Sequence, residues 1–123
     1  MSAFASLQQV AAPPLAPVAE PIDVEHLSRM TLGEQSLERE VLELFDRQAA
    51  MLLVRIREAA PAVARASAHT LKGSALGIGA WRVARAAEAV EHANAAEFLK
   101  ALFVLDGAIE EAKAAIAGLL RAH

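Results

Sequence analysis

Apolar residues recur at steps of three and four along most of the chain after Ile22, and this spacing determines the class of fold. Between Glu34 and Glu58 one helical face collects the residues Leu37, Val41, Leu42, Phe45, Ala49, Leu52, Leu53 and Ile56. No segment alternates polar and apolar residues as a half-buried strand does. The only proline after Ile22 is Pro61, which suits the first turn of a helix because the amide hydrogen it lacks would be unpaired there. The sequence therefore predicts an all-α fold.

The turn residues divide this region into one short and four longer helices. We expect them at about 23–30, 34–58, 61–77, 80–93 and 95–123, with Gly77 and Gly79 closing the third. Short connections between long helices force neighbours to run antiparallel. We therefore predict an antiparallel up-down-up-down four-helix bundle at 22–123, with a short extra helix at its N-terminal end. Residues 1–21 hold four prolines among alanines and almost no charge, and are expected to be a disordered tail.

Composition excludes several classes of function. The formal net charge of −3 argues against nucleic-acid binding, which requires a basic surface. The chain has no cysteine, so it can form neither a disulfide nor a thiolate metal site. No apolar run approaches the roughly 18 residues of a membrane span, and no signal peptide is recognisable. We expect a cytoplasmic, monomeric protein with no membrane contact.

The stretch "HTLKGSA", residues 69–75, places a glycine inside a predicted helix, where glycine costs roughly 1 kcal/mol relative to alanine. The inward stripe of this helix is expected to consist of Val63, Ser67, Thr70, Leu71, Ser74 and Ile78. The opposite face then carries Arg65, His69, Lys72, Gly73 and Leu76, because positions three and four apart share a face. Gly73 follows His69 by one turn and would give another protein access to the imidazole. The alternative explanation is that Gly73 allows tight packing of two helices.

The runs "EVLELFDRQAAMLLVRIREA", "AHTLKGSALGIGA" and "VARAAEAVE" resemble the histidine-containing phosphotransfer (HPt) domain of multistep two-component signalling. The resemblance covers about residues 22–121, and its most specific motif is His-x-Leu-Lys-Gly-Ser. It implies a four-helix bundle in which one histidine accepts a phosphoryl group from a receiver-domain aspartate or donates it to one. The implied partners are response-regulator receiver domains, such as those of a hybrid histidine kinase and a downstream regulator.

By this resemblance His69 is the phosphoacceptor, and Lys72 would neutralise the phosphoryl oxygens. Glu91 lies 22 residues further on, where the family often has a Glu or Gln beside the imidazole, and would fix the tautomer of the ring. Solvated surface side chains are the alternative for Lys72 and Glu91. The residues expected to flank the histidine and dock the receiver are Arg65, Leu76, Arg82 and Arg85. The chain should bind no cofactor or nucleotide itself, and the receiver would supply Mg²⁺.

Two other functions fit a helical bundle. A carboxylate-bridged metal site needs Glu-x-x-His on two helices, whereas Glu88 and His92 are spaced i, i+4 and no second pair matches. The other histidines are His26, His69 and His123. A non-catalytic adaptor that binds receivers without carrying phosphate is the remaining alternative.

Overall fold

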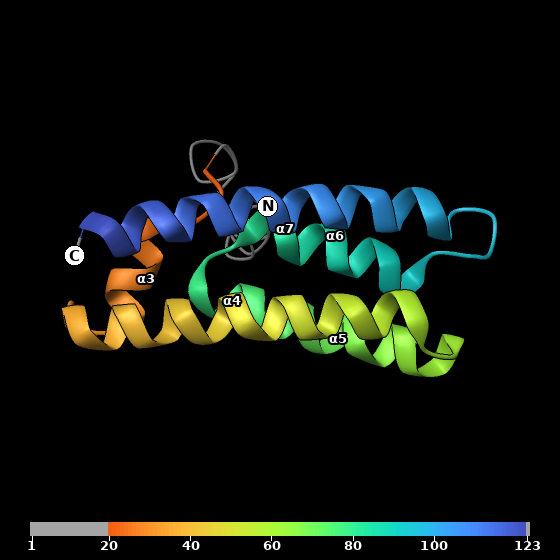
Figure 1. Cartoon of the computed structure of the whole chain (residues 1–123), viewed down its shortest axis with the longest axis horizontal. Coiled ribbons are helices and arrows are strands. Elements are labelled where there is room, and N and C mark those ends of the chain that lie inside the picture. The colour runs from red at the N-terminus through yellow and green to blue at the C-terminus, as the bar shows by residue number, and fades with distance from the viewer. Residues whose placement is uncertain (1–19, 123) are drawn as a thin grey trace, which may run out of the picture.

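The computed structural model describes residues 20–122, and within this range the chain forms five helices and no strand. The helices are α3 (Val24–Met30), α4 (Gln35–Glu58), α5 (Pro61–Ile78), α6 (Trp81–His92) and α7 (Phe98–Ala122) (Figure 1). The predicted all-α class is confirmed, and so is the short helix before the four longer ones. The tail predicted at 1–21 lies outside the described residues except for Glu20 and Pro21.

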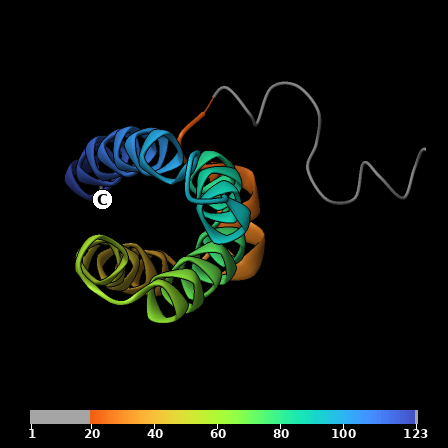
Figure 2. The same ribbon diagram turned by 90° about the vertical axis from the view of Figure 1, so that its right-hand side faces the viewer.

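The four longer helices lie side by side with their long axes roughly aligned (Figure 1). Short connections join α4 to α5 and α6 to α7 at the right-hand end of the bundle axis in Figure 1. Seen end-on, α4, α5, α6 and α7 follow one another around that axis, and α3 lies outside the ring (Figure 2). Helix α5 packs against both α4 and α6, and α7 packs against α6 and α4.

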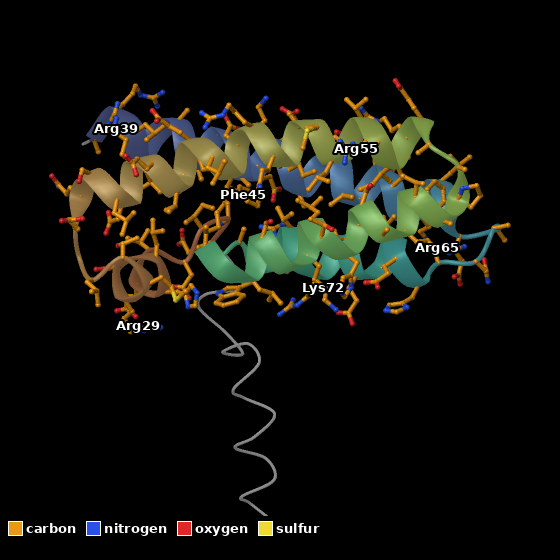
Figure 3. The ribbon with its side chains drawn as sticks, turned by 90° about the horizontal axis from the view of Figure 1, so that it is seen from below. Arg29, Arg39, Phe45, Arg55, Arg65 and Lys72 are labelled. Atoms are coloured by element: carbon orange, nitrogen blue, oxygen red, sulfur yellow. The ribbon has the colours of Figure 1, made fainter. Side chains whose placement is uncertain are left out.

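The core lies along the inner faces of all four longer helices. Phe45 points from α4 into the bundle and is 3% exposed (Figure 3). Leu42, Leu71 and Leu105 come from three different helices and are completely buried. Burial of a side chain of this size contributes about 1.5–3 kcal/mol. These contacts hold the helices at fixed positions and so fix the residues on their outer faces.

The inward face of α5 differs from the predicted stripe. Val63 is 50% exposed and Thr70 is also exposed, whereas Ala64, Ala68 and Ala75 are buried. The prediction gave weight to the larger side chains, but α5 lies between α4 and α6 and turns its alanines toward them. Small side chains let neighbouring helix backbones approach closely, so the stripe is rotated from the one expected.

Two helix ends also differ from their predicted positions. Gly77 is helical, and α5 ends at Ile78; Gly79 caps it with a φ of 83°, in the left-handed region that glycine adopts without strain. Helix α7 begins at Phe98 rather than near Ala95, because Asn94 and Glu97 close a separate turn before it. In that turn the backbone N–H of each residue donates to the side chain of the other. No helix within residues 20–122 is both long and apolar enough to cross a membrane.

Candidate functional site

His69 lies in the middle of α5 and faces away from the bundle. Its side chain is 66% exposed, whereas its neighbour Ala68 and Leu71 are fully buried. The outward orientation expected from helical spacing is therefore observed. A docking protein could reach the ring without any change in the core.

Glu91 on α6 contacts the His69 ring directly. Glu91 Oε2 lies 2.9 Å from His69 Nδ1, across the contact between α6 and α5. An ionised carboxylate can only accept hydrogen bonds, so Nδ1 carries the proton and donates a hydrogen bond to Glu91. In the neutral ring the free lone pair is then on Nε2. Glu91 is only 19% exposed, so it is held between the helices rather than solvated.

Gly73 follows His69 by one helical turn and is exposed. A Cβ atom at this position would have no heavy atom within 4 Å outside its own stretch of helix. Tight helix packing therefore does not explain the glycine among the described residues. The missing side chain instead leaves open space on the outer face, next to the imidazole.

Lys72 and Arg65 are the cationic residues of α5 on this side of the molecule (Figure 3). Lys72 Nζ lies 3.9 Å from Oε2 of Glu88, a separation at which an ion pair is weak. Arg65 Nη2 donates to the carbonyl oxygen of Ala93 at 3.2 Å. Arg65 therefore ties the start of α5 to the end of α6, in addition to contributing a positive charge near His69.

His69 and Glu91 line an open depression of about 530 Å³ on the surface. Its other lining residues are Arg65, Ala66, Thr70 and His92. Within residues 20–122, no three His, Cys, Asp or Glu side chains are grouped as a metal ion would require. The depression therefore offers the imidazole of His69, the carboxylate of Glu91 and the guanidinium of Arg65, a set suited to binding and transferring an anion.

Of the predicted docking residues, only Leu76 and Arg65 share a helix with His69. Leu76 is 40% exposed and lies one turn beyond Lys72 on α5. Arg82 and Arg85 instead line a groove of about 570 Å³ between α6 and α7. Arg82 also pairs with Glu111 across that groove at 3.2 Å. The predicted site residues therefore fall on two surfaces. The first is around His69 and includes Arg65, Lys72, Gly73 and Glu91. The second is the α6–α7 groove, which includes Arg82 and Arg85.

Sequence reasoning missed two residues beside the site. Gln48 of α4 accepts a hydrogen bond from Ser74 Oγ at 3.3 Å and so contacts the residue after Gly73. His92 Nε2 lies 3.8 Å from Glu91 Oε1. The sequence signal for His92 was its position next to Glu91; Gln48 gave no comparable signal because its partner lies 26 residues away on another helix.

Comparison with known proteins gives one match. The family model described as "Hpt domain" matches residues 40–115, which cover α5, α6, most of α4 and much of α7. This range includes His69 and every other predicted site residue. No curated protein and no solved structure matches the chain.

Proposed function

Since this chain belongs to the Hpt domain family, we propose that it is a phosphoryl carrier in which His69 exchanges a phosphoryl group with receiver-domain aspartates. Membership of the family gives the chain a phosphotransfer role in two-component signalling. The relay between two receivers and the identity of the carrier residue are our proposal. The antiparallel up-down-up-down bundle belongs to the same proposal, and the connections of α4 to α5 and of α6 to α7 at one end in Figure 1 support it.

The contact between His69 Nδ1 and Glu91 is the observation that carries the proposal. With Nδ1 protonated, the lone pair of Nε2 attacks the phosphorus of the aspartyl phosphate. The N–P bond forms as the O–P bond breaks, and the aspartate leaves as a free carboxylate. The phosphorylated ring is cationic while it keeps the Nδ1 proton, and the carboxylate of Glu91 stabilises that charge. The reverse steps return the phosphoryl group to a second receiver.

The surroundings of His69 supply the other requirements of transfer. Phosphoryl transfer depends on in-line positioning and on neutralisation of charge on the phosphoryl oxygens. Lys72, one turn from His69 on the same helix, is the residue that we expect to contact those oxygens, because its pairing with Glu88 is long. We expect Mg²⁺ to enter with the receiver, as this chain's role is limited to the histidine, its carboxylate and the nearby cation.

Docking of the receiver requires an exposed surface around the ring. The open space at Gly73 and the exposed Leu76 extend this surface along α5. Met51 of α4 and Val63 of α5 are each about half exposed and line one depression between these helices, which adds apolar area. Solvent-exposed apolar side chains grouped in this way are typical of protein interaction sites.

Transfer of label from a receiver tests the proposal directly. A receiver domain carrying radiolabelled phosphate is mixed with the chain and Mg²⁺, and the label on each protein is followed after gel separation. We expect label on the wild type, with the acid lability and alkali stability of a phosphoramidate, and none on His69→Gln. Circular dichroism should show that this variant keeps its helices, because His69 is exposed. Equal labelling of the two proteins would exclude His69, and receiver binding without label on the wild type would favour the adaptor function.

A further inference from the structure

Among residues 20–122, only one of the two carboxylate oxygens of Glu91 has a hydrogen-bond partner. Oε2 accepts from His69 Nδ1, whereas Oε1 is buried and accepts no hydrogen bond from these residues. A buried acceptor without a hydrogen-bond partner is energetically unfavourable. A carboxylate with one free oxygen can also rotate about its last bond, and rotation would break its contact with His69. A donor near Oε1 would remove both problems.

His92 is the imidazole placed to provide that donor. Its Nε2 lies 3.8 Å from Glu91 Oε1, which is about 0.6 Å beyond the usual upper limit of an N–H···O hydrogen bond. The side chain is 67% exposed and belongs to the last residue of α6, so a change of rotamer can shorten the distance. Both the imidazolium and one of the two neutral tautomers carry a proton on Nε2.

The other charged groups around Glu91 are already engaged or have the wrong sign. Arg65 lines the same depression, but it donates to the Ala93 carbonyl and forms no ion pair with Glu91 among the described residues. His69 occupies Oε2, and Glu88, one turn earlier on α6, is an acceptor that lies near Lys72. His92 is therefore the donor best placed to reach Oε1.

We propose that His92 is a positioning residue: its Nε2–H donates to Glu91 Oε1 and holds the carboxylate with Oε2 on His69 Nδ1. The consequence for transfer rests on the proposed function, because His92 acts on the ring of His69 through Glu91. It fixes the proton on Nδ1, and so keeps the lone pair of His69 on Nε2, where the phosphoryl group is taken up.

Two readouts test this role, the ¹⁵N shifts of the His69 ring and the rate of phosphoryl uptake from a labelled receiver. In His92→Ala we expect the population with a protonated Nδ1 to fall and uptake to slow by about 2- to 10-fold, the effect of one lost hydrogen bond. His92→Gln keeps an N–H donor at a similar reach and should restore both. Lys113→Ala, an exposed truncation on α7, is the matched control and should change neither.

A double-mutant cycle separates positioning through Glu91 from a general structural effect. In a Glu91→Ala background, His92→Ala should add no further loss, because the group it positions is gone. Additive losses, or wild-type shifts and rates in His92→Ala alone, would overturn the inference. These outcomes are distinct from failure of the proposed function, in which the wild type itself takes up no phosphate at His69. In that case the ring shifts still decide whether His92 holds Glu91.

Discussion

At the scale of single residues, Gly73 shows how access to a site can oppose stability. It lies in the middle of α5 with open space where a Cβ atom would be, so the fold could accept alanine without any displacement. Glycine at an exposed helical position is less favourable than alanine by roughly 0.5–1 kcal/mol. Since packing does not require it, we infer that the glycine is kept for access to His69.

We expect Gly73→Ala to stabilise the protein and to slow phosphoryl transfer. The melting temperature should rise by about 4–8 °C for each kcal/mol gained in a domain of this size. Transfer should slow because a methyl group now occupies the open space one turn from His69 through which the receiver approaches, and Gly73→Leu should slow it further. Thermal unfolding by circular dichroism and uptake of label from a receiver provide the two measurements.

Gly118→Ala is the control for this trade-off. Gly118 is on α7, away from the His69 site, and a Cβ there would meet only the Arg121 side chain at an ordinary 3.8 Å. It should stabilise the fold with no change in transfer. Equal transfer rates in Gly73→Ala, Gly73→Leu and the wild type would contradict the role of Gly73 in access.

The sequence predicted the outward direction of His69 and the proximity of Glu91 because both depend on regular spacing and on the resemblance to a known family. The sequence did not predict the environment of Glu91. Whether Oε1 is buried, and how far His92 lies from it, depend on the rotation of α6 against α5 and on side-chain rotamers. Neither is encoded in a local pattern.

At the scale of elements, hydrophobic periodicity predicted the ends of every helix to within a few residues, but it predicted the wrong buried face for α5. On α4, large side chains dominate, and those expected inside are buried except for Leu37 and Val41 at its start. On α5 the helix turns its alanines inward, and Val63 remains on the surface. A pattern read from large apolar residues is therefore less reliable for an alanine-rich helix between two neighbours.

Helix α3 has only seven residues and depends on contacts made far along the chain. The carboxylate of Asp23 accepts from the backbone N–H of His26 at 3.1 Å and from the indole Nε1–H of Trp81 at 2.9 Å. The Asp23 backbone N–H also donates to the carbonyl of Gly79 at 2.9 Å. Asp23 was predicted as the start of this helix, but its contacts with Trp81 and Gly79, more than 50 residues away, had no local signal.

The attachment of α3 should weaken in acid. Partial burial raises the pKa of Asp23, but the hydrogen bonds from Trp81 and His26 lower it by more, so the net pKa lies below its ordinary value of 3.8. A carboxyl group whose pKa is lowered by folding stabilises the fold fully above its unfolded pKa. That contribution is lost as the pH falls through the lower, folded pKa. We therefore expect α3 to become less stable below about pH 4.

Trp81 is the only tryptophan, so its fluorescence during urea unfolding reports on this region. Other carboxyl groups also titrate in acid, and Asp23→Asn isolates the contribution of Asp23. Asparagine has one acceptor oxygen where aspartate has two, so it can keep only one of these hydrogen bonds, and it has no charge to lose. The stability difference between wild type and Asp23→Asn should shrink as the pH falls from 6 to 3. A difference that stays constant over this range would contradict the assignment.

At the scale of the whole molecule, the four cations expected to act on the receiver, Arg65, Lys72, Arg82 and Arg85, lie on two separate surfaces. The net charge is −3, so an acidic partner must be attracted by local positive charge rather than by the protein as a whole. Arg65 lines the same depression as His69, and Lys72 follows His69 by one turn of α5. Arg82 and Arg85 instead line the groove between α6 and α7. Under the proposed function, the first pair would contact the docked receiver, and the second pair would act on it across a greater distance.

The salt dependence of transfer should distinguish these two roles. Lys72→Glu places a negative charge beside the reacting phosphoryl group, so we expect transfer to slow at every salt concentration. The double variant Arg82→Glu/Arg85→Glu should slow transfer at about 0.01 M salt, where the Debye length is about 30 Å, and lose this effect near 1 M, where it is about 3 Å. Stopped-flow or rapid-quench measurement of receiver dephosphorylation across this range provides the rates. If the double variant matches the wild type even at the lowest salt, the arginines of the α6–α7 groove take no part in steering, and the docking surface is confined to α5 and its immediate neighbours.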